Sequence, residues 1–99
     1  MNYFFHETAE EEFFAAVEYY EESQLGLGLR FSEEVYSTIK RICAHPNAWT
    51  SIDSKTKRCI TNQFPYGILY RIENDQIRIM AVMHLHRKPG YWKDRGINF

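Results

Sequence analysis

Two runs rich in β-forming residues meet at Asn74-Asp75, and this junction constrains the fold more than any other feature of the chain. Ile68 to Glu73 precedes the junction and Gln76 to Leu85 follows it. Asparagine and aspartate tolerate the left-handed backbone that a two-residue hairpin turn requires. The sequence therefore predicts an antiparallel β-hairpin over residues 68–85.

A two-residue turn also fixes which residues of the hairpin face each other. It places Arg71 opposite Arg78 and Leu69 opposite Met80. Because side chains alternate between the faces of a strand, one face is apolar and should meet the rest of the core (Ile68, Tyr70, Ile72, Ile77, Ile79 and Ala81). The other face is mixed (Leu69, Arg71, Arg78, Met80, Val82, His84 and His86).

The facing arginines leave two interpretations open. Like charges directly across a sheet are destabilising unless an opposite charge compensates them. Either an anionic binding partner supplies that charge, or Glu73 or Asp75 of the same hairpin does. The apolar residues beside the arginines are likewise either a partner-binding surface or buried under the C-terminal tail.

The first half of the chain predicts a strand and two helices. Asn2 to His6 is a short aromatic run that suggests a strand. Thr8 and Glu11 have the spacing of a helix capping box. Apolar residues at helical spacing then form two stripes, the second of which ends before His45-Pro46. The stripes are Phe13, Ala16, Val17 and Tyr20, then Phe31, Val35, Thr38, Ile39 and Ile42.

The remaining elements complete a fold prediction. Trp49 to Lys57 is polar and predicts a loop, and Arg58 to Gln63 is a weak strand candidate. The 99 residues are enough for one domain with one core. We expect a single α+β domain over residues 1–99, with order β-α-α-β-β-β and the helical hairpin on one face of a mainly antiparallel four-stranded sheet.

Charge and cysteine content restrict the function classes. Residues 1–50 hold nine acidic and three basic side chains, whereas residues 51–99 hold four and nine, which suggests a basic working face on an acidic body. No run is long enough for a membrane helix or a signal-peptide core. Cys43 and Cys59 are too few for a disulfide framework, so we expect a reduced, cytoplasmic protein that contacts no membrane.

The C-terminal third resembles a known family. Phe64-Pro65-Tyr66-Gly67-Ile68-Leu69-Tyr70-Arg71-Ile72, the strand Ile77 to His84, and Arg87-Lys88-Pro89-Gly90-Tyr91-Trp92 look like the RelE/ParE superfamily of type II toxin–antitoxin toxins, also called plasmid stabilisation proteins. The ParE-like branch is the most similar. The resemblance spans essentially the whole chain. It implies a compact β-α-α-β-β-β fold, no cofactor, and a cognate antitoxin whose C-terminal segment wraps the toxin in a hetero-oligomer.

Two mechanisms divide that superfamily. RelE-like members resemble ribosome-dependent, metal-independent endoribonucleases, which need a proton acceptor and cations around the scissile phosphate of the mRNA. The chain offers His84, His86, Arg87 and Tyr91 for such chemistry, with Lys55, Lys57 and Arg58 as further cations. However, Gly67 stands where RelE has a catalytic arginine, and the expected strand Cys59 to Gln63 lacks a cation. The nuclease set is therefore incomplete.

ParE-like members resemble non-enzymatic inhibitors that bind DNA gyrase and stall it on cleaved DNA. The Gly67 position and the C-terminal tail favour this branch, and a relative that only binds its antitoxin is a third possibility. The residues expected to contact the target or the antitoxin are Leu69, Arg71, Arg78, Met80, Arg87, Lys88, Tyr91, Trp92, Lys93 and Arg95. His84 and His86 would share a strand face, but no further ligands are placed near them, so no metal site is predicted.

Overall fold

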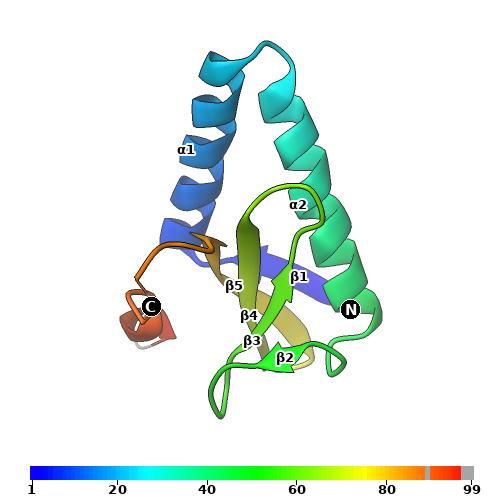
Figure 1. Cartoon of the computed structure of the whole chain (residues 1–99). Coiled ribbons are helices and arrows are strands. Elements are labelled where there is room, and N and C mark those ends of the chain that lie inside the picture. The colour runs from blue at the N-terminus through cyan, green and yellow to red at the C-terminus, as the bar shows by residue number, and fades with distance from the viewer. Residues whose placement is uncertain (89, 97–99) are drawn as a thin grey trace.

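A single sheet carries a helical hairpin on one face (Figure 1). The computed structural model describes residues 1–88 and 90–96. Its elements are β1 (Asn2–Phe5), α1 (Glu7–Ser23), α2 (Leu27–Ala44), β2 (Thr50–Ser51), β3 (Lys57–Ile60), β4 (Tyr66–Glu73), β5 (Gln76–His84) and the 3-10 helix η1 (Lys93–Gly96). This arrangement confirms the α+β prediction.

The sheet has five strands in the order β1-β5-β4-β3-β2. Strand β1 pairs in parallel with β5, and the other neighbours are antiparallel. The prediction of four strands was therefore one short, because β2 lies in the segment expected to be a loop. Strand β3 also begins one residue earlier than predicted, at Lys57, and ends at Ile60.

Helix α1 begins differently from the prediction. Its N-cap is His6, whose Nδ1 accepts a hydrogen bond of 3.1 Å from the Thr8 amide. The capping box of Thr8 and Glu11 was therefore wrong, because the Thr8 amide, which was expected to donate to the Glu11 side chain, donates to an imidazole nitrogen of His6 instead. Helix α1 consequently includes Glu7 in its first turn, where the helix dipole favours a negative charge.

The two helices meet closely at their shared turn. The Glu21 carboxylate accepts from the amides of Gly26 (2.9 Å) and Gly28 (3.0 Å), which are first-turn amides of α2 without partners inside the helix. A Cβ on Gly28 would lie 2.7 Å from the Val17 carbonyl oxygen. Glycine therefore permits the close helix approach, and Glu21 stabilises the start of α2.

The main core lies between the helices and the sheet. The burial of the apolar stripes confirms the predicted orientation of the two helices, since Phe13, Phe31 and Ile39 are each at most 2% exposed. The Tyr70 hydroxyl donates to the Pro46 carbonyl at 2.5 Å and so ties β4 to the end of α2. The buried members are Ala9, Phe13, Ala16, Phe31, Val35, Ile39, Ile42, Cys59, Phe64, Ile68, Tyr70, Ile77, Ile79 and Val82.

The hairpin turn is as predicted. Asn74 and Asp75 have φ angles of 51° and 62°, which is the left-handed conformation of a tight hairpin turn. The predicted pairs from Glu73–Gln76 to Tyr70–Ile79 are all present.

A β-bulge changes the register beyond Tyr70. Leu69 pairs with Ala81 instead of Met80, so β5 carries one extra residue. Met80 and Ala81 therefore both belong to a second cluster on the far face of the sheet, the face away from the helices, while Val82 joins the main core. His84 pairs with Tyr66 and moves to the helix side as well. The predicted faces of Ala81, Val82 and His84 were wrong, because one inserted residue inverts the alternation.

Candidate interaction surface of the sheet and the C-terminal tail

Both arginines of the facing pair on the hairpin have partners within the fold, but only Arg78 has a carboxylate partner. Arg71 and Arg78 are direct neighbours, as predicted. An Arg78 terminal nitrogen lies 3.5 Å from a Glu73 carboxylate oxygen, and the other donates to the Arg95 carbonyl at 3.2 Å. Arg71 Nε donates to the Thr56 hydroxyl at 3.0 Å. The local interpretation with Glu73 therefore holds for Arg78.

The apolar residues beside the arginines lie under the tail. Leu69 and Met80 are fully buried, and Trp92 is 3% exposed. Together with Ala81 and Met83 they form a second core cluster on the face away from the helices. A partner reaches Leu69 or Met80 only if the tail is displaced.

A cluster of charges holds the tail against the start of α1. The Arg95 guanidinium contacts both carboxylate oxygens of Glu12, at 2.7 and 3.0 Å, and donates to the Met80 carbonyl at 3.0 Å. Glu12 also accepts from the Val82 amide (3.2 Å) and from Arg87 (3.3 Å). Figure 1 shows the resulting position of the C-terminal segment beside the first turns of α1.

Tyr91 lies between two of these arginines. The guanidinium carbon of Arg87 is 3.5 Å from the ring centroid of Tyr91, and that of Arg95 is 5.0 Å away. Burial and then the neighbouring Glu12 carboxylate raise the pKa of the Tyr91 phenol above its usual value. The hydroxyl is thus a neutral proton donor at physiological pH, and it is poorly suited to act as a base.

His84 faces the helices rather than the tail. Its ring centroid lies 5.2 Å from that of Tyr66 and 5.3 Å from that of His86. His84 Nδ1 accepts from the His86 amide at 3.1 Å. With Glu12, Tyr19 and Arg87 among its neighbours, His84 lines a cavity of about 300 Å³ between α1 and the end of β5.

Arg58 was predicted only as one of the further cations of a nuclease, and the strand positions Cys59 to Gln63 were noted as lacking a cation. The strand includes both Lys57 and Arg58. A Cβ on Gly67 would lie 3.1 Å from Arg58 Cδ, so glycine makes room for the arginine stem on the neighbouring strand. The Arg58 side chain therefore occupies the space that a side chain at position 67 would fill.

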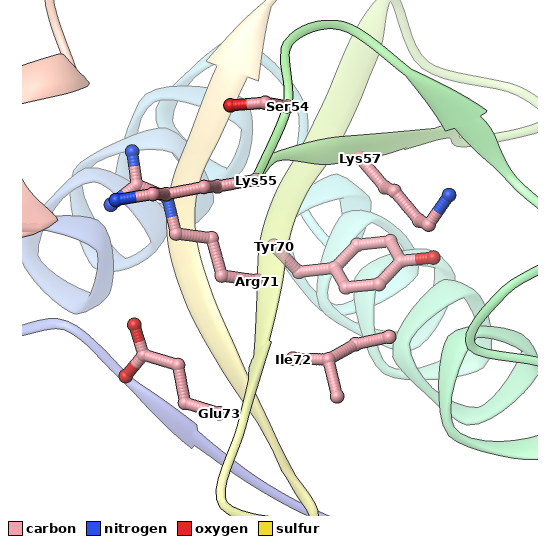
Figure 2. A pocket seen from close by; sticks show the side chains of 7 residues that line it. All are labelled: Ser54, Lys55, Lys57, Tyr70, Arg71, Ile72 and Glu73. Carbon is pink, nitrogen blue, oxygen red and sulfur yellow. The ribbon is translucent and has the colours of Figure 1, made fainter.

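A second cation-lined cavity spans β4 near its end. It has a volume of about 330 Å³. Figure 2 shows Lys55, Arg71 and Glu73 on one side of the strand, and Lys57, Tyr70 and Ile72 on the other. Lys57 Nζ donates to the Ser51 hydroxyl at 2.9 Å, and burial raises the pKa of Tyr70 to about 12.

Some predicted contact residues are exposed. Lys88 and Lys93 are exposed, and the Arg87 side chain is 52% exposed despite its contact with Glu12. Pro89, part of the tail motif, lies outside the described residues. Within residues 1–88 and 90–96, no group of three or more histidine, cysteine, aspartate or glutamate side chains could hold a metal ion.

A comparison with protein families identifies the chain. The model of the family described as the ParE toxin of type II toxin–antitoxin system, parDE, matches residues 3–89. The chain belongs to the ParE toxin family.

Comparison with solved structures agrees at the level of fold. A chain of the chromosomal ParDE toxin–antitoxin system from P. aeruginosa superposes with a TM-score of 0.73 at 15% sequence identity. The match covers 87% of the present chain and 97% of that chain. No curated protein matches the sequence.

In the part of the chain that the structure describes, no helix is long and apolar enough to cross a membrane. The cations of the tail are divided between internal ion pairs, made by Arg87 and Arg95, and exposed side chains, Lys88 and Lys93.

Proposed function

We propose that this ParE-family protein is the toxin of a toxin–antitoxin pair and arrests growth by binding DNA gyrase and stalling it on cleaved DNA. The observation that carries the proposal is that the candidate nuclease side chains are engaged in internal contacts. His84 and Arg87 line one cavity with Glu12, but Arg87 is paired with Glu12 and stacks on Tyr91, and Arg58 lies on the opposite face of the sheet. In-line cleavage of mRNA needs a free proton acceptor and free cations around one phosphate.

The tail is the surface that we assign to target contact. Its exposed cations, Arg87, Lys88 and Lys93, project from a segment fixed to α1 by the Glu12–Arg95 pair. A rigidly held basic segment suits recognition of an acidic surface, because less conformational entropy is lost on binding. In this proposal the other predicted contact residues do not touch the target and instead support the fold beneath this surface. They are Arg71, Arg78, Leu69, Met80, Tyr91 and Trp92.

The partner and location follow from the same proposal. A cognate antitoxin neutralises the toxin and forms a hetero-oligomer with it. Gyrase and DNA are cytoplasmic, so the toxin acts in the cytoplasm. The proposed mechanism uses no cofactor.

Controlled induction in bacterial cells tests the function. Growth arrest with DNA damage and intact mRNA supports gyrase inhibition, and co-expression of the antitoxin should reverse it. Lys88→Gln should weaken the arrest, whereas Lys40→Gln, an exposed lysine on α2, should leave it unchanged. Growth arrest with cut mRNA and undamaged DNA would favour the RelE-like nuclease, and normal growth would favour a relative that only binds antitoxin.

One observation keeps the nuclease as a second candidate. Arg58 brings a cation next to Gly67, the position where RelE has its arginine. A nuclease that used Arg58 would lose mRNA cleavage in Arg58→Gln and would leave gyrase unaffected.

A further inference from the structure

A depression on the far face of the sheet is lined by two side chains whose hydrogen-bond donors have no partner among the described residues. It has a volume of about 280 Å³ and lies between the loop before β3 and the tail. Its lining comes from three separate parts of the chain: Ile52, Asp53, Arg58, Met83, Gly90, Trp92 and Lys93.

Arg58 is the first unpaired donor. Its Nε is buried, and no hydrogen bond or ion pair joins its guanidinium to the residues that the structure describes. The other arginines of the sheet and tail do have partners: Arg71 binds Thr56, and Arg78, Arg87 and Arg95 bind carboxylates. A half-buried cation without an anion is costly, so Arg58 is poised for an anion from outside the described chain.

Trp92 is the second unpaired donor. The side chain is 3% exposed, and its Nε1 is buried without a hydrogen-bond partner among the described residues. Buried indole N–H groups usually have a partner. Arg58 and Trp92, each with an unpaired donor, line one small depression together with Lys93, which indicates a site for an acceptor.

The charge of the depression selects a monoanion. Asp53 does not serve Arg58, because its carboxylate oxygen accepts from the amides of Lys55 (2.8 Å) and Thr56 (2.7 Å). Those bonds lower the pKa of Asp53 and keep it ionised. Among the described lining residues, two cations and one anion leave a single positive charge.

The shape and lining favour a carboxylate over a phosphodiester. Ile52, Met83 and the Trp92 ring give the depression apolar walls, which suit the methylene stem of a side chain. A phosphodiester carries a substituent on each side and needs an open groove, whereas a carboxylate enters as the end of a chain. A planar carboxylate also matches the fork of a guanidinium.

We propose that this depression is a carboxylate pocket, in which Arg58, the Trp92 indole N–H and Lys93 bind a glutamate or aspartate side chain of the antitoxin. We assign the acidic side chain to the antitoxin because the antitoxin must cover the toxin, and an acidic side chain in this pocket would neutralise one of the toxin's cations. The pocket does not depend on whether the toxin acts on gyrase or on mRNA.

Nuclear magnetic resonance of the Trp92 indole N–H tests the pocket directly. In a Trp49→Phe background the toxin has a single tryptophan, so one indole signal remains. N-acetylglutamate N-methylamide should shift this signal saturably, with half-saturation on the order of millimolar for so small a ligand. The matched glutamine compound and sodium chloride of equal ionic strength should not shift it.

Two variants locate the binding group. Arg58→Gln should weaken binding of the glutamate compound about tenfold, because it removes a charge-assisted hydrogen bond. Lys57→Gln removes the same charge from the adjacent residue, whose side chain is bonded to Ser51 on the other face, and should leave binding within about twofold. Arg58→Lys retains the charge and should fall between them.

Three results would overturn the proposal. The glutamate compound could give no saturable shift, or one equal to that of the glutamine compound. Dimethyl phosphate could shift the signal where the glutamate compound does not, which would make this a phosphodiester site. Finally, in the complex with antitoxin the indole signal should already be shifted and should no longer respond to the glutamate compound; a continued response would show that the antitoxin leaves the pocket empty.

Discussion

Glu12 on α1 and Arg95 in η1, 83 residues apart, form a bidentate ion pair with distances of 2.7 and 3.0 Å. The pair also serves the β-bulge of β5: Arg95 donates to the Met80 carbonyl on one side, and Glu12 accepts from the Val82 amide on the other. The same contact therefore satisfies an irregular strand, fixes the tail and covers the second core cluster.

Removing the Glu12 charge should loosen this arrangement. The Glu12 and Arg95 side chains are only 13% and 10% exposed, so Glu12→Gln leaves a nearly buried guanidinium unpaired. We expect the free energy of unfolding to fall by about 3 kcal/mol. In a Trp49→Phe background, the fluorescence of Trp92 should shift to longer wavelength as the tail detaches.

Glu11→Gln is the matched control for that experiment. Glu11 precedes Glu12 on α1 and is exposed. Its substitution should change the free energy of unfolding by less than about 0.5 kcal/mol, as is usual for surface positions. Urea unfolding curves that coincide for the two variants would contradict a stabilising role for the ion pair.

Stability should depend on the protonation of His6. Burial, and then the positive charges of Arg78 and Arg95, lower the pKa of His6, while Glu7 and Glu12 oppose the shift. Below the ordinary pKa of about 6.5 the unfolded chain takes up a proton that the folded protein resists, so the free energy of unfolding should fall as pH drops. Protonation also removes the Nδ1 acceptor that caps α1.

The variant His6→Asn tests whether His6 causes this pH dependence. Asparagine retains an N-cap side chain but does not titrate. Urea unfolding at pH 7.5 and 5.5 should show a smaller loss of stability for His6→Asn than for the parent. An equal loss would place the responsible group elsewhere.

The hairpin turn offers a pair of opposed substitutions. Asp75 has a φ of 62°, a conformation that glycine adopts without a steric penalty. Asp75→Gly should stabilise the protein by about 0.5 kcal/mol, and Asp75→Ala should destabilise it by about 1 kcal/mol. Thermal unfolding of the two variants measures the sign; the reverse order would be inconsistent with the left-handed turn.

Gly28 should be intolerant of a side chain. Its hypothetical Cβ would lie 2.7 Å from the Val17 carbonyl oxygen, which belongs to backbone and cannot rotate away. Gly28→Ala should therefore cost about 2 kcal/mol by forcing the helices apart, although alanine favours helix by about 1 kcal/mol. Ser37→Ala, at an exposed site on α2, should be nearly neutral in the same unfolding assay.

Local signals predicted much of this fold. The turn at Asn74 and Asp75 gave the hairpin and its first four pairs, and the helix stripes gave the core, because both depend on residues close in sequence. The N-cap was missed because histidine is an uncommon capping residue and Thr8 offered the usual pattern. His6 takes that role in a setting formed by Arg78 and Arg95, which are distant in sequence.

Long-range contacts limited the prediction of the site. The bulge at Met80 in β5 has no glycine that would have indicated it in the sequence, and its backbone groups are satisfied by Glu12 and Arg95 from opposite ends of the chain. Because the bulge inverts the alternation, it also decided the side on which His84 lies. The sequence named Arg58 only as a further cation for a related reason: its environment depends on the space at Gly67 across the strand pair.

A supercoiling assay with purified DNA gyrase tests the proposed function most directly. Increasing amounts of the toxin should suppress supercoiling of relaxed plasmid while gyrase-linked cleaved DNA accumulates, and adding the antitoxin should reverse both effects. Unimpaired supercoiling at a toxin concentration that cleaves mRNA on purified ribosomes would contradict the account.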